Sequence, residues 1–208
     1  MRSRLVRGLI TEPPLILASA SPRRARILEG LGVEFVLDPS GVAEDALSGE
    51  APERHVERLA WAKASSVVSR HRSGTVLGAD TIVVLDGSLL GKPADPSDAV
   101  RMLRAIRGRW HDVVTGLALI RSSDGVGTLG HERSRVLVRD LPDGEIEEYV
   151  QGGEPLDKAG AYGIQECGAA IVERVDGCFY NVAGLPVSRL CRLLEELGSR
   201  PRGPGGPA

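Results

Sequence analysis

The spacing of hydrophobic and polar residues predicts alternating helices and strands along most of the chain. One-sided apolar spacing predicts helices over residues 22–31, 56–68, 97–107, 143–150 and 186–197. Short apolar runs between turn residues predict strands over 15–18, 34–37, 76–85, 110–120, 128–138, 168–175 and 178–182. These elements mix without strict strand–helix alternation, so we expect an α/β protein with a mixed sheet.

Turn-forming and low-complexity residues predict how the chain is divided. Ser21 can cap the first helix, with Pro22 at its first position. Residues 38–52 are acidic and rich in Gly, Pro and Ser, which is typical of a mobile loop. We expect a flexible leader over residues 1–13, a single domain over 14–198 and a disordered tail over 199–208.

Composition excludes several classes of partner. The chain has 208 residues, of which 42% are hydrophobic and 26% charged, as in ordinary soluble proteins. Only 3% are aromatic and the net charge is −2, so we expect no nucleic-acid partner. No apolar stretch is long enough to span a membrane. Three cysteines without a CxxC pair indicate reduced thiols, and we expect a cytoplasmic protein.

Charged residues interrupt the predicted core in two segments. Arg23 and Arg24 lie in the first turn of a helix, where backbone N–H groups already favour an anion. A solvated helix face is the competing explanation. Asp80 intrudes into an apolar strand, where an unpaired carboxylate costs several kcal/mol. A structural role at a strand edge competes with metal binding or activation of water, and we favour a functional role.

Further cations and polar groups fall in turns and loops. Lys63 lies on the apolar face of a predicted helix, and Lys92 lies in a Gly-Lys-Pro turn. Each can be a surface lysine or can bind a phosphate. Glu44 ends the acidic loop and can supply a second carboxylate, although the loop gives no register. Gln165, in a glycine-rich loop, offers both a donor and an acceptor that can bind the edge of a base.

Together these segments supply cations for phosphates, carboxylates for a metal and small residues that let the backbone come close. That combination of residues is typical of a site that binds a nucleoside triphosphate. Neither a Walker A motif nor a metal-ligand spacing among the histidines is present.

The chain resembles the Maf family of nucleoside triphosphate pyrophosphatases. Four segments carry the resemblance: LASASPRR, GADTIVVLDG followed by LGKP, EPLDKAGAYGIQ and DGCFYNVAGLP. The resemblance implies a mixed, elongated sheet with flanking helices, two lobes around a central cleft and a fold similar to inosine triphosphate pyrophosphatase. It also implies a divalent metal, Mg²⁺ or Mn²⁺, a homodimer, and hydrolysis of a nucleoside triphosphate to the monophosphate and pyrophosphate.

The resemblance also assigns roles to individual residues. Asp80 matches the proton acceptor, and Asp80 and Glu44 are expected to hold the metal. The positions expected to bind substrate are Ser19, Arg23, Arg24, Lys63, Thr81, Lys92 and Gln165. Arginine, threonine and glutamine at positions 23, 81 and 165 resemble the dTTP/UTP branch of the family. One departure follows Gln165, where the familiar glycine is replaced by Glu166.

We therefore expect an enzyme that hydrolyses dTTP and UTP and clears modified nucleotides from the pool. The family's link to septum formation supports a second hypothesis, a nucleotide-binding regulator of cell division. A third is a pyrophosphatase that prefers purine or 7-methyl-GTP substrates.

Overall fold

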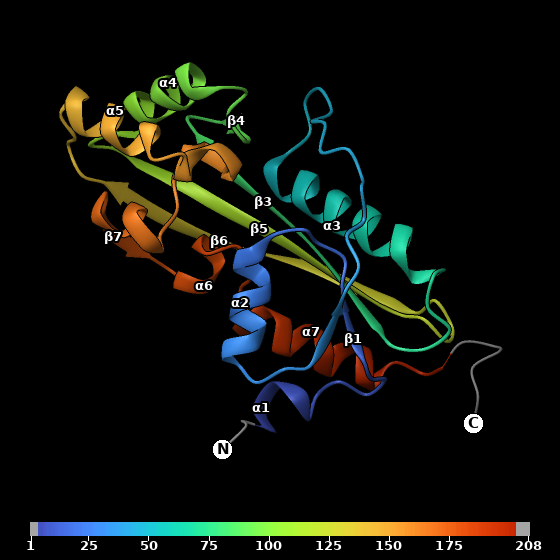
Figure 1. The fold of residues 1–208 in the computed structure, drawn as a ribbon. Helices are drawn as coiled ribbons and strands as arrows, with labels where there is room; N and C mark the ends of the chain where they lie inside the picture. The colour runs from blue at the N-terminus through green and yellow to red at the C-terminus, as the bar shows by residue number, and fades with distance from the viewer. Residues whose placement is uncertain (1–3, 203–208) are drawn as a thin grey trace. The chain divides into compact units, whose positions relative to one another are not determined.

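The structure, a computed structural model, describes residues 4–202 and contains a mixed sheet with flanking helices (Figure 1). Within that range seven strands form one sheet in the order β2-β1-β3-β5-β6-β7, and β4 pairs with β3. Strand β1 pairs in parallel with β2 and β3, whereas β3–β4 and β6–β7 are antiparallel. The strands are β1 (Leu15–Leu17), β2 (Phe35–Leu37), β3 (Thr75–Leu85), β4 (Ser88–Leu90), β5 (Trp110–Arg121), β6 (Gly127–Val138) and β7 (Val172–Asp176).

Seven α-helices and three 3₁₀ helices lie within the described residues. They are α1 (Arg4–Arg7), α2 (Pro22–Gly30), α3 (Pro52–Val68), α4 (Pro96–Ile106), α5 (Asp143–Gln151), η1 (Glu154–Asp157), η2 (Ala159–Ala161), η3 (Glu166–Ala170), α6 (Phe179–Val182) and α7 (Val187–Ser199). The predicted α/β class, the mixed sheet and the five longer helices are confirmed. None of the helices in residues 4–202 has the length and apolar character that crossing a membrane requires.

One predicted strand is wrong and another is shortened. Residues 166–170 form η3, so β7 starts only at Val172, and Phe179–Val182 is helix α6. Aromatic and β-branched residues favour strands, which explains the incorrect prediction. Tertiary contacts override that preference, because the buried Asn181 amide donates to the Val113 carbonyl at 2.9 Å and to Ser134 Oγ at 3.0 Å.

Contacts divide the described chain into two compact units. The first comprises residues 4–80, 116–131 and 187–202, and the second comprises 81–115 and 132–186. The predicted flexible leader and disordered tail stay predictions, and their outermost residues, 1–3 and 203–208, lie outside the described range. The single domain over 14–198 and the cleft between two lobes also stay predictions.

In the first unit, helix α3 lies alongside the sheet (Figure 1), and its backbone comes very close to strands β3 and β5 at two glycines. A Cβ atom added to Gly78 of β3 would lie 2.1 Å from the Ala60 carbonyl oxygen. A Cβ atom added to Gly116 of β5 would lie 2.3 Å from the Val56 carbonyl oxygen. Only glycine lets the two backbones meet at this distance. The buried core around this contact contains Ile16, Ala18, Ala60, Ala64, Val67, Val76, Ala118 and Ile120.

Gly78→Ala tests this contact. We expect the free energy of unfolding to fall by about 3 kcal/mol, because the added methyl group overlaps backbone that cannot move without shifting α3. Chemical denaturation measures the change. The control is Gly30→Ala in α2, where nothing lies within 4 Å of the added Cβ. That variant should keep its stability or gain up to about 1 kcal/mol. Equal effects of the two substitutions would contradict the close approach.

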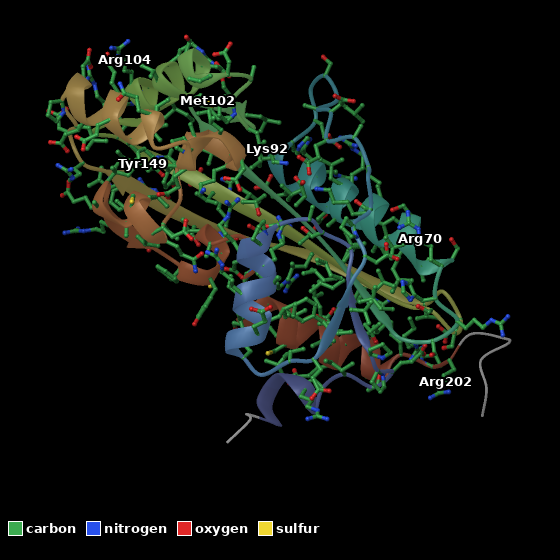
Figure 2. The ribbon with its side chains drawn as sticks, in the orientation of Figure 1. Arg70, Lys92, Met102, Arg104, Tyr149 and Arg202 are labelled. Atoms are coloured by element: carbon green, nitrogen blue, oxygen red, sulfur yellow. The ribbon has the colours of Figure 1, made fainter. Side chains whose placement is uncertain are left out.

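The second unit has its own apolar core, in which α4 contacts α5 and η2. Met102 of α4, labelled in Figure 2, belongs to this core together with Leu103 and Ile106. His111 and Tyr162 are buried in the same unit and share a hydrogen bond of 2.7 Å between Nε2 and the phenol oxygen. Burial lowers the pKa of His111 from 6.5 to about 4, since desolvation disfavours the charged ring.

His111 should make stability depend on pH. The unfolded ring takes up a proton below its usual pKa, whereas the folded ring stays neutral down to about pH 4. The contribution of neutral His111 to the free energy of unfolding is therefore complete above pH 6.5. It is lost as the pH falls toward 4, and its full size is on the order of 3 kcal/mol. Denaturation between pH 6.5 and 5 should show a shallower decline for His111→Gln, which does not titrate. Identical slopes would show that His111 is not the cause.

Candidate active site

Two hydrogen bonds to Ser19 organise the chain between β1 and α2. Ser21 is the residue before α2 and Pro22 the first in it, as predicted, but the Ser21 side chain caps no backbone N–H group. Ser19 supplies the local acceptor instead: its Oγ accepts from the Ser21 N–H at 3.2 Å and from Arg24 Nη1 at 2.9 Å. Arg24 Nη1 also donates to the Ala79 carbonyl at 3.0 Å. Arg24 thus joins the start of α2 to strand β3.

The guanidinium of Arg24 lies inside the first unit, with only 7% of the residue exposed. Burial lowers the pKa of Arg24, while the nearby Asp80 carboxylate raises it and Arg23 lowers it. Arginine nevertheless stays charged in proteins. Arg23 is partly exposed one position earlier in the same helical turn. The predicted pair of arginines therefore consists of one buried and one accessible cation.

Lys63 and Asp80 form a buried ion pair in the first unit. Lys63 is 4% exposed and Asp80 is 5% exposed, and Lys63 Nζ lies 2.7 Å from Asp80 Oδ1. The same ammonium donates to Glu44 Oε1 at 2.6 Å. The carboxylates of Asp80 and Glu44 thus converge on one cation. A buried charge needs such compensation, because taking it out of water costs several kcal/mol.

Five of the predicted site residues therefore come together in the first unit, on α2, α3, β3 and the segments before α2 and α3: Ser19, Arg24, Glu44, Lys63 and Asp80. Sequence periodicity placed Lys63 and Asp80 correctly on an apolar helix face and in a buried strand. The register of Glu44 could not be predicted, since residues 38–51 contain neither a helix nor a strand.

Thr81, the residue after Asp80, belongs to a hydrogen-bonded network in the second unit. Its Oγ1 lies 3.0 Å from Oγ1 of Thr115, which donates to the Asn181 carbonyl at 3.1 Å. Thr115 and Asn181 are fully buried. Sequence reasoning did not single out either residue. Asn181 does lie in DGCFYNVAGLP, one of the segments that resemble the Maf family, but residues 178–182 of it were predicted as a strand.

Lys92 and Gln165 lie in two segments of the second unit that are joined by backbone hydrogen bonding. The Gly160 N–H group donates to the Gly91 carbonyl at 3.0 Å, next to Lys92, which is labelled in Figure 2. Tyr149, also labelled there, helps hold the Gln165 loop, because its phenol oxygen accepts from the Gly163 N–H at 3.2 Å.

Glu154 organises the other end of the Gln165 loop. Its carboxylate accepts hydrogen bonds from the Tyr149 hydroxyl at 3.0 Å and from the backbone N–H groups of Cys167 at 3.1 Å and Gly168 at 3.2 Å. Lys158 is buried and donates to Asp157 Oδ1 at 2.8 Å and to the Glu154 carbonyl. The charges of this loop thus hold its own backbone, on both sides of Gln165.

Glu166 adopts a left-handed backbone conformation. Its φ is 59°, a region that costs a residue with a Cβ atom roughly 1–2 kcal/mol but costs glycine little. This position is the departure noted in the sequence, where the resembled family has glycine. The loop therefore keeps a glycine-like turn at this residue.

Substitutions at position 166 can isolate this backbone strain. Glu166→Gly should exceed Glu166→Ala in free energy of unfolding by about 1 kcal/mol, since both variants lose the carboxylate and only alanine keeps a Cβ atom. Thermal or chemical denaturation of the two proteins gives the difference. If Glu166→Ala were the more stable variant, the left-handed conformation would be refuted.

Comparison with known proteins gives the family. The family model described as Maf-like protein matches residues 14–197. The chain belongs to the Maf family. The dTTP/UTP pyrophosphatase of Clostridioides difficile is 46% identical over 182 residues, covering 88% of this chain and 94% of that protein. The dTTP/UTP pyrophosphatase of Aquifex aeolicus is 48% identical over 183 residues, covering 88% and 95%.

A solved structure is also similar to this Maf-family chain. The nucleoside-triphosphatase, or dITP/XTP pyrophosphatase, from Mycobacterium abscessus aligns with a TM-score of 0.38 and 18% identity. The alignment covers 62% of this chain and 74% of that chain. At that TM-score nothing further follows, and similarity to the inosine triphosphate pyrophosphatase fold stays a prediction.

Proposed function

We propose that this protein is a hydrolase that cleaves dTTP and UTP to the nucleoside monophosphate and pyrophosphate. The observation that carries the proposal is the buried group of Arg24, Lys63 and Asp80 with Glu44 beside it, in a Maf-family chain. Burying several charged side chains costs folding free energy. A polyanionic substrate needs the cations, and its metal needs the carboxylates. Family relatives named dTTP/UTP pyrophosphatase match almost their whole length to this chain.

The chemistry follows from the charges. Water attacks the α-phosphorus, the bond between this phosphorus and the bridging oxygen to the β-phosphorus breaks, and pyrophosphate leaves. Asp80 orients the water and accepts its proton. Arg23, Arg24, Lys63 and Lys92 stabilise the negative charge that develops on the phosphates, and the Ser19 hydroxyl adds a hydrogen bond.

Asp80 and Glu44 would hold a divalent metal, Mg²⁺ or Mn²⁺. One oxygen atom of each carboxylate contacts the Lys63 ammonium, which supports the proposal that the two carboxylates lie close enough together to share a metal ion. Residues 4–202 contain no group of three or more His, Cys, Asp or Glu side chains that could hold a metal ion. Two carboxylates suffice for Mg²⁺, which usually completes its shell with water and substrate phosphates. When bound, the metal would polarise the phosphoryl group.

Base preference is proposed for Thr81 and Gln165. Gln165 can both donate to and accept from a pyrimidine edge. The Thr81 hydroxyl is oriented by its partner Thr115, which is itself buried. These roles rest on the resemblance of positions 23, 81 and 165 to the dTTP/UTP branch.

A cytoplasmic location and a homodimer complete the proposal. Cys167, Cys178 and Cys191 are all free thiols, as a reducing compartment favours. The homodimer rests on the family resemblance, and analytical ultracentrifugation of the purified chain tests it.

The test of function is pyrophosphate release from dTTP, UTP, CTP, ITP, GTP and 7-methyl-GTP with Mg²⁺. We expect release from dTTP and UTP, and a fall of kcat by about 10²- to 10⁴-fold in Asp80→Asn, because the proton acceptor is lost. Asp86→Asn is the control: Asp86 is an exposed turn residue paired with Arg109 at 2.6 Å, and asparagine tolerates its φ of 49°.

Each outcome of this assay has a distinct meaning. Full turnover by Asp80→Asn would refute the role of that carboxylate. Preferential release from 7-methyl-GTP or purine substrates would refute the base preference. If the natural protein bound nucleotide but hydrolysed none of the panel, the enzyme would be refuted and a nucleotide-binding regulator of cell division would replace it.

A further inference from the structure

The acidic segment, residues 38–51, follows helix α3 along its length in the opposite direction (Figure 1). The segment contacts α3 and the two residues after Ser69, and the order of these contacts along the segment is the reverse of their order along residues 55–71. They join Asp38 to Arg70 and His71, the Ser40 carbonyl to Ser66, Glu44 to Lys63, the Asp45 carbonyl to Arg58, and Glu50 to Arg58 and His55. A mobile loop was predicted here, but the structure gives the segment a defined register on α3.

Arg58 fastens this segment at both ends of residues 45–50, a short stretch that begins directly after Glu44. Its Nη2 donates to the Asp45 carbonyl at 3.0 Å, on the residue directly after Glu44. Its Nε and Nη2 donate to the two carboxylate oxygens of Glu50, each at 2.7 Å. The planar guanidinium fork fits this paired arrangement, which an ammonium cannot reproduce.

Glu50 is itself well held. Its side chain is 11% exposed, and His55 Nδ1 lies 3.2 Å from Oε2. Hydrogen bonding to Arg58 lowers the pKa of Glu50 to about 2, so the carboxylate stays ionised near neutral pH. Arg58 and Glu50 therefore form a lasting link between α3 and the acidic segment.

Glu44 depends on such a link because it lies on irregular backbone and its side chain is 41% exposed. Fixing the backbone of one residue costs about 1–2 kcal/mol of conformational entropy. Where folding has already fixed the segment, metal binding does not bear that cost. Lys63 and Asp80 need no comparable support, since a regular helix and a regular strand carry them.

We infer that Arg58 is a positioning residue, which holds Glu44 against Lys63 and Asp80 through the Asp45 carbonyl and Glu50. The inference rests on the proposed function, in which Glu44 is a metal ligand. No hydrogen bond described above joins Arg58 to the Asp80 or Glu44 carboxylate, and Arg58 interacts with Asp80 only through charge. The positioning effect therefore passes through the backbone next to Glu44.

The test compares Arg58→Met with Arg70→Met. Both remove an arginine that contacts the acidic segment, but Arg70 contacts Asp38 and the Pro39 carbonyl, farther from Glu44. Figure 2 labels Arg70 at the far end of α3. Loss of positive charge alone should strengthen cation binding near carboxylates. Weaker metal binding in Arg58→Met would therefore reflect lost positioning.

Mn²⁺ affinity, followed by electron paramagnetic resonance, is the main measurement on the full chain. We expect Arg58→Met to bind Mn²⁺ about 10-fold more weakly, as supporting residues of metal sites do, while Arg70→Met changes affinity less than about 2-fold. Amide hydrogen exchange should accelerate over residues 43–50 in Arg58→Met and over 38–41 in Arg70→Met. Arg58→Lys keeps the charge and serves as the second variant if Arg58→Met fails to fold. It should lose Mn²⁺ affinity less than 10-fold and show the same faster exchange over residues 43–50.

The outcomes separate this inference from the proposed function. Equal Mn²⁺ affinity in the natural protein, Arg58→Met and Arg58→Lys would overturn the positioning role, even if dTTP were hydrolysed. Absence of Mn²⁺ binding by the natural protein would overturn the metal site and the inference with it. Pyrophosphate release by the natural protein scores the proposed function separately in both cases.

Discussion

The direct contact between the backbones of α3 and β3 sets the geometry of the candidate active site. Gly78 lets the strand meet the helix at Ala60, and from that point both elements lead into the site. Lys63 lies about one helical turn farther along α3, and Asp80 lies two residues farther along β3, on the same face of the strand as Gly78. The distance of 2.7 Å between Lys63 Nζ and Asp80 Oδ1 therefore follows from where helix α3 and strand β3 touch.

The same helix organises a part of the chain that has no regular structure. Side chains on α3 receive the acidic segment at several successive points, so the segment inherits its order from the helix. A single element thus provides a buried cation toward the sheet and a row of donors toward the segment.

Sequence patterns predicted the parts of the site that lie on regular elements and failed where contacts rather than periodicity decide. Lys63 and Asp80 could be found because each interrupts an apolar pattern. The pairing of Glu44 could not, since an irregular segment has no period that fixes which residue faces the helix. Residues 178–182 were predicted as a strand, whereas the buried amide of Asn181 holds residues 179–182 as helix α6. The left-handed turn at Glu166 has no sequence signal beyond the departure from glycine.

The buried guanidinium of Arg24 has a consequence for how stability is distributed. Its hydrogen bonds to Ser19 and Ala79 freeze a long, rotamer-rich side chain when the protein folds. The side-chain entropy is thus lost on folding and not on ligand binding, and the guanidinium charge is held in a fixed position. An apolar side chain of similar volume would often suit the fold equally well or better. Under the proposed function, the fold would keep this buried cation for substrate binding at some cost in stability.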